Sequence, residues 1–128
     1  MALRQAGKTL GDAVDAGLPE LASCLEAALA GVQKLGAARE GEKTMVDALA
    51  PAVAAMQKAI SEGADTADAL AAAAAAAAAG AQATISMQAL KGRASYLGPR
   101  SVGHEDPGAA STAIIMGALS EVAQQQVT

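Results

Sequence analysis

The sequence predicts an all-α fold, and three observations support this prediction. Alanine accounts for 37 of the 128 residues, and it has the highest helix propensity of all residues. The chain has no Phe or Trp and a single Tyr, which is too few aromatic residues for a β-sandwich or barrel. Apolar residues recur at spacings of three and four, as on one helix face. We therefore expect one domain with a thin, closely packed helical core.

A first helix is expected from about residue 10 to residue 35. Its apolar stripe consists of Leu18, Leu21, Leu25, Leu29 and Val32. Pro19 is expected to separate a short leading turn from the main helix, and Gly36 to end the helix as a left-handed C-cap. Cys24 lies within the stripe, so we expect a buried structural thiol and a reducing, cytoplasmic location.

A second helix is expected after the polar turn at residues 37–43. Thr44 and Asp47 form a variant of the capping box at its start. Its apolar stripe consists of Val46, Leu49, Val53, Met56 and Ile60. Pro51 is expected either to kink this helix or to begin its main body.

A third helix is expected to begin at a cap formed by Asp65 or Thr66 and to continue to Leu90. It contains the alanine run 71–79, which is about half the length that a bilayer span needs. Because alanine has no bulk on any face, neighbouring helices can approach from several sides. We interpret this segment as a central, buried helix and expect no membrane association.

A fourth helix is expected after residues 91–108, a segment without hydrophobic periodicity. Asp106 is expected to be its N-cap and Pro107 its first residue. The residues expected to face inward are Ile114, Ile115, Leu119 and Val122. Aperiodic segments of this length within a helical domain are commonly functional.

The charge of the chain excludes some classes of partner. Nine Lys and Arg residues oppose thirteen Asp and Glu residues, which gives a net charge of −4, and there is no basic cluster. Binding to nucleic acid or to an anionic membrane is therefore not expected. The pairs Asp12 with Asp15 and Asp65 with Asp68 have helical spacing near helix starts, where capping explains them more simply than metal binding.

The segment 91–108 contains the only His, the only Tyr and two of the Arg residues of the chain. Arg93 and Arg100 offer planar donor forks for phosphate, and the helix start after Asp106 favours an anion. The chemistry suggests a phosphate or nucleotide site. The alternatives are that both arginines pair with Glu105, Asp106 or helix-end carbonyls and that His104 is a hydrogen-bonded loop residue. Asp106 and Pro107 would then be no more than a helix start.

The segment Gly92–Ala109 closely resembles the C-terminal signature of the nucleotide-binding L subunit, or L domain, of dihydroxyacetone kinases. Lys43–Leu49, preceded by Gly36, resembles the adenine-side loop and helix start of that family. The resemblance implies a barrel of antiparallel helices that binds ADP or ATP with Mg under a capping loop, residues 91–108 here. It also implies a partner K subunit that holds dihydroxyacetone covalently on a histidine and receives the phosphoryl group.

The resemblance also implies roles for individual residues. Gly36 and Met45 would line the adenine pocket, and Arg93 would reach the nucleotide. Asp106, Pro107 and Gly108 would close over the ribose or adenine side. The signature includes Arg100 and His104, but it assigns them no contact.

The chain departs from the family pattern in one respect. It lacks the Asp-rich Asp-x-Asp-His-Gly motif whose carboxylates hold the Mg ions, so it resembles the C-terminal half of an L domain, an incomplete barrel. Phosphoryl transfer depends on positioning and on charge neutralisation by metal, so we expect no catalysis by this chain alone. The alternative is a non-catalytic helical module that self-associates, because half a barrel leaves apolar helix faces exposed. A separately encoded N-terminal half and a phosphotransferase-system protein are further possible partners.

Overall fold

The computed structural model describes residues 17–91 and 93–127, apart from the side chains of Arg93, Gln126 and Val127. Within these residues there are α-helices and short 3₁₀ helices but no β-strand, so the predicted all-α class is confirmed. The α-helices are α2 (Leu18–Gly36), α3 (Val46–Ser61), α4 (Thr66–Ala83) and α5 (Pro107–Val127). The 3₁₀ segments are η1 (Thr84–Ser86) and η2 (Arg93–Ser101), and η2 is divided by a kink at Gly98, which is not helical.

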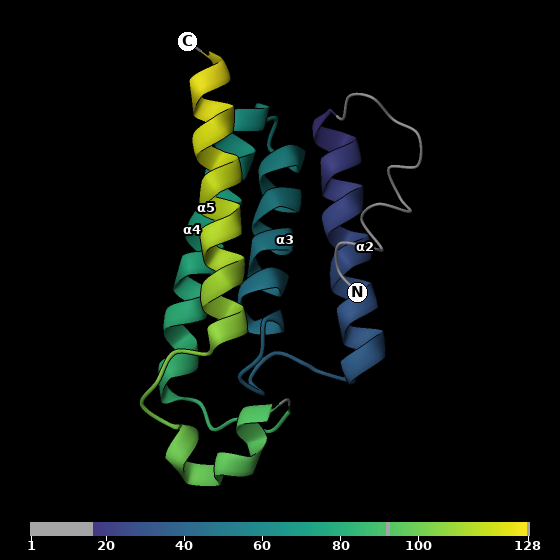
Figure 1. The fold of residues 1–128 in the computed structure, drawn as a ribbon. Helices are drawn as coiled ribbons and strands as arrows, with labels where there is room; N and C mark the ends of the chain where they lie inside the picture. Colours follow the sequence, from purple (N-terminus) through teal and green to yellow (C-terminus); the bar gives the residue numbers. More distant parts are fainter. Residues whose placement is uncertain (1–16, 92, 128) are drawn as a thin grey trace.

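The α-helices form an up-and-down bundle in which each helix runs antiparallel to the next (Figure 1). α3, α4 and α5 pack against one another, and α2 packs on the side of α3. The turn before α3, the end of α4, η2 and the start of α5 all lie at one end of the bundle (Figure 1). Chain segments that are far apart in the sequence therefore meet at this end.

The core consists mainly of alanine, as the composition predicts. The cluster that joins the helices contains Ala48, Ala52, Ala69, Ala73 and Ala77, all with no exposed surface, together with Met56 and Met116. Small side chains bury little area each, but they let the helix backbones approach closely. The two methionines supply the bulk that fills the remaining space.

α3 and α4 approach each other closely at the point where α3 contains a proline. Pro51 has no N–H, so it cannot donate to the carbonyl of Asp47 in the preceding turn. Gly80 of α4 lies directly against this carbonyl: a methyl group on Gly80 would overlap the Asp47 oxygen and lie 3.1 Å from the Cα of Ala48. α3 nevertheless continues from Val46 to Ser61, so its main body does not begin at Pro51.

Two predicted helix ends are wrong. The left-handed residue after α2 is Ala37, with φ 52°, whereas Gly36 is the last helical residue. α4 ends at Ala83 and is followed by η1, and Met87 is extended, so the helix does not reach Leu90. At the start of α2, Pro19 lies in the first turn, and the leading turn expected before it falls outside the described residues.

The predicted inward face of α5 is also wrong. Ile114, Ile115 and Val122 are 73%, 59% and 52% exposed, and Leu119 is only partly buried. The buried face consists of Ala109, Thr112, Met116 and Ala123. This face packs against the alanine-rich α4, and its small residues allow a closer approach than a row of isoleucines would.

α4 with η1, Thr66–Ser86, is long and apolar enough to cross a bilayer by length and composition alone. Its alanine face, however, packs between α3 and α5. α4 thus packs against two neighbours, but Ala75, Ala78 and Ala79 on its other face are exposed. The predicted central position is confirmed, whereas the predicted burial holds for one face only.

Candidate functional site

A pocket of about 380 Å³ lies at the end of the bundle where α3 and α5 begin. The turn before α3 and the start of α5 form most of its lining. The lining residues are Lys43, Thr44, Met45, Lys91, Ala94, Asp106, Pro107 and Gly108. Four residues named from the sequence, Met45 and Asp106 to Gly108, thus share one pocket.

The α3 side of the pocket is fixed by Asp47, which is 4% exposed. Its carboxylate accepts hydrogen bonds from the backbone N–H of Gly41 at 2.6 Å and of Thr44 at 2.9 Å. The Thr44 hydroxyl in turn accepts from the N–H of Val46 at 3.1 Å. The Asp47 half of the predicted capping box is present, whereas the Thr44 hydroxyl accepts from Val46 and not from the N–H of Asp47. These bonds set the path of the chain into Met45.

The α5 side is fixed by Asp106, which is also buried. Its carboxylate accepts from the N–H of Ala109 at 2.9 Å, and α5 begins at Pro107. The N-cap and first helical residue are therefore as predicted. The N–H of Asp106 donates to the hydroxyl of Thr84 at 3.0 Å, which joins this helix start to the end of α4.

Gly108 brings the two sides together. A methyl group on Gly108 would lie 3.2 Å from an Asp106 carboxylate oxygen and 3.3 Å from the Cβ of Met45. A larger side chain at this position would fill the pocket or separate the two helix starts.

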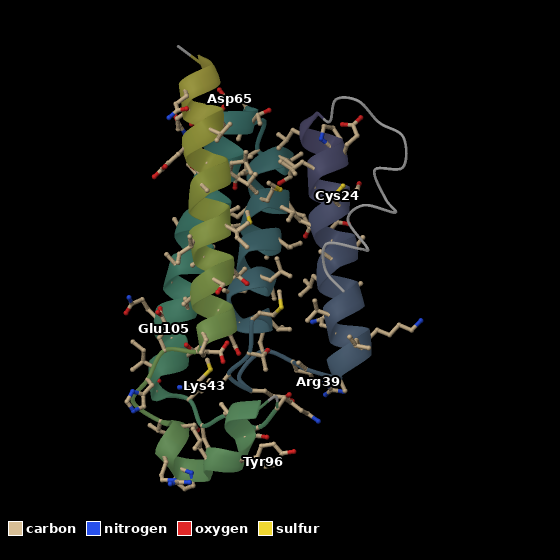
Figure 2. All side chains as sticks on the ribbon, viewed as in Figure 1. Cys24, Arg39, Lys43, Asp65, Tyr96 and Glu105 are labelled. Atoms are coloured by element: carbon tan, nitrogen blue, oxygen red, sulfur yellow. The ribbon has the colours of Figure 1, made fainter. Side chains whose placement is uncertain are left out.

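Lys43 is the residue of this site that sequence reasoning missed. It is 3% exposed, and its ammonium donates to the carbonyl of Thr84 at 2.7 Å and to the carbonyl of His104. Figure 2 shows Lys43 where the turn before α3 meets the loop before α5. The turn 37–43 reads as solvent-exposed from its polar composition. No local pattern marks Lys43, because both of its carbonyl partners are distant in the sequence.

A smaller pocket of about 190 Å³ adjoins the first. Its additional lining residues are Leu97, Ser101, His104 and Glu105, and it shares Lys43, Ala94, Asp106 and Pro107 with the larger pocket. The surrounding loop is ordered by its own hydrogen bonds: Gly103 N–H donates to the Ile85 carbonyl at 2.7 Å, and Ala89 N–H to the Ser101 hydroxyl at 2.8 Å. Residues 93–108 thus form a folded cover over this end of the bundle.

Other residues named from the sequence lie elsewhere. Gly36 is exposed at the end of α2 and lines neither pocket. Arg100 is exposed and lines neither pocket, whereas His104 lines the smaller one. The backbone of Arg93 begins η2, but the predicted role of its side chain falls outside the described residues.

The electrostatics of the larger pocket favour an anion. Lys43 and Lys91 contribute two cations to the lining, against the single carboxylate of Asp106. The amino ends of α3 and α5 both lie at this pocket, and a helix amino end carries partial positive charge. The arrangement suits a ligand with an anionic group and a flat apolar part to pack against Met45.

Among the described side chains, no three from His, Cys, Asp and Glu come together to hold a metal ion. The side chain of Asp65 accepts from the N–H of Asp68 at 2.9 Å and caps α4, so this pair has the structural role of a helix cap. The pair Asp12 and Asp15 lies outside the described residues.

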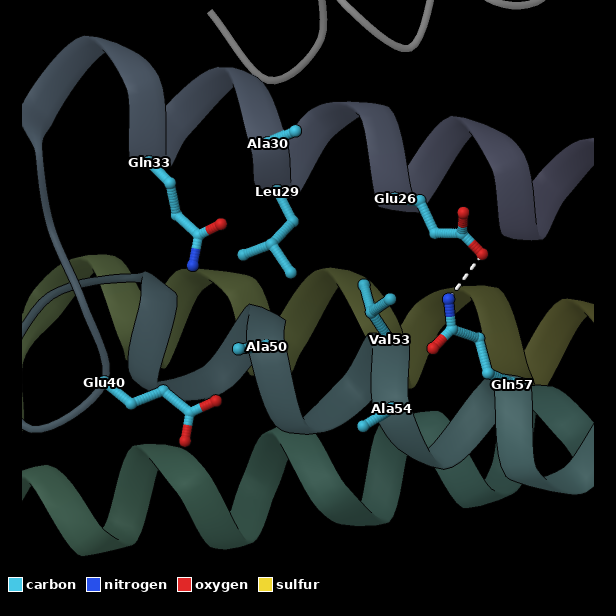
Figure 3. Close-up of a pocket in the computed structure, with 9 residues that line it drawn as sticks. All are labelled: Glu26, Leu29, Ala30, Gln33, Glu40, Ala50, Val53, Ala54 and Gln57. Carbon is cyan, nitrogen blue, oxygen red and sulfur yellow. Dashed lines mark hydrogen bonds between the residues drawn. The ribbon is translucent and has the colours of Figure 1, made fainter.

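A groove of about 320 Å³ runs between α2 and α3 (Figure 3). Its floor includes Leu29 and Val53, and its rim carries Glu26 and Glu40. The amide of Gln57 donates to the Glu26 carboxylate across the groove (Figure 3). None of the residues named from the sequence as site residues lines it.

The family model of the DAK2 domain matches residues 1–121. The ADP-binding subunit DhaL of the PEP-dependent dihydroxyacetone kinase of Escherichia coli is 43% identical over 95 residues, which is 74% of this chain and 45% of that protein. A subunit of the same description from Listeria innocua is 42% identical over 99 residues, 77% of this chain and 44% of its own length. The human triokinase/FMN cyclase is 40% identical over 107 residues, 84% of this chain and 19% of that protein. The chain thus spans less than half the length of these relatives.

Proposed function

The chain belongs to the DAK2 domain family, and on this basis we propose that its larger pocket binds an adenine nucleotide, ADP or ATP, as part of a dihydroxyacetone kinase. In this proposal the base packs on Met45, and Asp106, Pro107 and Gly108 close over the base or ribose. The phosphates lie on the side of the lysines, where Arg93 also reaches them. A cytoplasmic location is part of the proposal.

The observation that carries the proposal is the convergence of the two chain segments that resemble the family signature. Met45 and the run from Asp106 to Gly108 line one pocket of about 380 Å³, within the usual range of roughly 300–1,000 Å³ for ligand sites. Lys43 and Lys91 in the lining and two helix amino ends give this pocket the charge that a phosphate chain requires. Gly36 lines neither pocket, so the proposal assigns it no contact.

The proposed reaction is phosphoryl transfer to dihydroxyacetone held by a partner K subunit, with ATP or a phosphotransferase-system protein as the source of the phosphoryl group. The described residues offer no metal cluster, and this transfer needs a metal to neutralise charge. Because the sequence contains no Asp-x-Asp-His-Gly motif, we propose that the Mg ligands come from a segment that this sequence does not contain. In this proposal the chain alone binds nucleotide without catalysing transfer.

Calorimetry with ADP, with and without Mg, tests the proposal. We expect saturable binding by the chain and its loss in Gly108→Val, because this side chain would meet Met45 and Asp106. Gly117→Val is the matched control: it lies in the same helix with nothing within 4 Å of an added methyl group, and binding should persist. Equal binding by both variants would contradict the proposed pocket.

A second proposal is self-association through α5, and a specific observation favours it. Ile114, Ile115 and Val122 form an exposed apolar face on a helix that contains one charged residue, Glu121, and such faces promote association. We propose that a second copy covers this face. Sedimentation equilibrium should give a dimer that Ile115→Glu dissociates, and a monomeric wild-type chain at micromolar concentration would refute it.

A further inference from the structure

The buried ammonium of Lys43 joins three segments of the chain. It donates to the carbonyl of Thr84, 41 residues away, and to the carbonyl of His104, 61 residues away. The first carbonyl belongs to the end of the α4 segment, and the second to the loop that leads into α5. A single side chain from the turn before α3 thus reaches both of the other segments at this end of the bundle.

The position of Lys43 is unfavourable in two ways. Its backbone has φ 63°, in the left-handed region that residues other than glycine rarely adopt. Its side chain is 3% exposed, and both of its hydrogen-bond acceptors are uncharged carbonyls, which only partly replace the hydration of an ammonium group. Such positions concentrate at functional sites, where the surrounding structure maintains them.

The loop that Lys43 holds also forms the wall of the pocket. Gly103 donates to the Ile85 carbonyl at 2.7 Å and Asp106 to the Thr84 hydroxyl at 3.0 Å. Both of these bonds attach the loop to the end of α4. The bond from Lys43 to His104 attaches the same loop to the side of the pocket that carries Met45. It therefore acts across the pocket, between its two walls.

We propose that Lys43 is a positioning residue that holds the 102–106 loop, and with it the wall formed by Asp106, Pro107 and Gly108, against Met45 before any ligand binds. The pocket is then pre-formed, and a ligand does not have to order the loop. We call the two hydrogen bonds of the Lys43 ammonium, to the carbonyls of Thr84 and His104, the tether. The effect of the tether on nucleotide affinity rests on the proposed function.

Hydrogen exchange of the full chain tests the tether without a ligand. In Lys43→Met, which keeps the length of the side chain and removes the charge, the amides of Gly103 and Asp106 should exchange at least about tenfold faster, while the interior of α4 stays protected. Lys43→Arg should restore part of the protection. Lys58→Met, an exposed lysine in the last turn of α3, is the matched control and should leave both amides unchanged. Wild-type exchange rates at Gly103 and Asp106 in folded Lys43→Met would overturn the proposal.

A measurement on the wild-type chain covers the case in which Lys43→Met does not fold. The ammonium protons of Lys43 should exchange slowly enough to give a resolved NMR signal, because Lys43 is buried and its ammonium donates to two carbonyls, whereas those of the exposed Lys58 exchange with solvent. Equally fast exchange at the two lysines would overturn the tether.

Titration with ADP separates the tether from the proposed function. Lys43→Met should bind ADP at least about tenfold more weakly than Lys58→Met, and Lys43→Arg should recover part of the loss. Faster loop exchange with unchanged ADP affinity would overturn the positioning role. If the wild-type chain binds no ADP but the loop amides exchange faster in Lys43→Met, the tether is supported and the proposed function is overturned.

Discussion

Gly80→Ala should destabilise this protein, although the same change in an ordinary helix is stabilising. Gly80 is in the interior of α4, where alanine gains about 1 kcal/mol in helix propensity. The new methyl group, however, would overlap the carbonyl oxygen of Asp47 and lie 3.1 Å from the Cα of Ala48. Both neighbours are backbone atoms of α3, which cannot turn away as a flexible side chain can.

The expected magnitude follows from these two opposing effects. Overpacking in a close-packed core costs about 1–3 kcal/mol, and we take the upper end because α3 as a whole must move. After the gain in propensity, the net loss in the free energy of unfolding is about 2 kcal/mol. For a domain of this size that corresponds to a fall in Tm of roughly 6–10 °C.

Thermal and urea unfolding, followed by circular dichroism, measure this effect. Gly117→Ala is the matched control: it is also within a helix, and nothing lies within 4 Å of its added methyl group. It should stabilise the protein by about 0.5–1 kcal/mol. If Gly80→Ala were as stable as Gly117→Ala, the close contact between α3 and α4 would be refuted.

Three further substitutions test the polar contacts around the pocket. Asp47→Ala leaves two backbone N–H groups without their acceptor and should cost about 2–3 kcal/mol in urea unfolding; a cost below 0.5 kcal/mol would contradict the capping arrangement. Thr84→Val keeps the shape of a fully buried side chain but removes the hydroxyl that accepts from the Asp106 N–H. It should lower the free energy of unfolding by about 1–3 kcal/mol, and NMR should detect faster hydrogen exchange of the Asp106 amide. Asp106→Ala removes the N-cap of α5 and should lower stability by about 1 kcal/mol, whereas an unchanged Tm would show that the cap contributes nothing.

Much of the fold follows from local sequence signals. The helix starts at Thr44, Asp65 and Asp106 are predictable because short polar side chains accept hydrogen bonds from the first free N–H groups of a helix. The structure contains each of these bonds: the side chains of Thr44, Asp65 and Asp106 accept from the N–H groups of Val46, Asp68 and Ala109. These signals act within a few residues, so they need no knowledge of the tertiary structure.

The orientation of α5 was not predictable in the same way. α5 has apolar residues on several faces, so spacing alone does not decide between Ile114 or Ile115 and Met116 as the buried residue. Packing decides it, because the alanine face of α4 accepts the small residues around Met116. Larger apolar residues are the usual inward choice, and here they are exposed.

The segments that form the site were predictable from the sequence, but their arrangement in space was not. Met45 and Gly108 were named from the resemblance, and their positions in one pocket emerge only when α3 and α5 start side by side. Lys43 could not be recognised, because its role depends on the carbonyls of Thr84 and His104, which are distant in the sequence. No local pattern marks a side chain whose partners are backbone atoms of other segments.

The most direct test of the proposed nucleotide pocket is NMR of the methionine methyl groups during titration with ADP. Met45 lines the pocket, whereas Met56 and Met116 are buried in the helical core, so the two core methionines are internal controls. We expect a saturable shift of the Met45 signal with little change in the other two. No shift of Met45 at millimolar ADP, or equal shifts of all three, would contradict it.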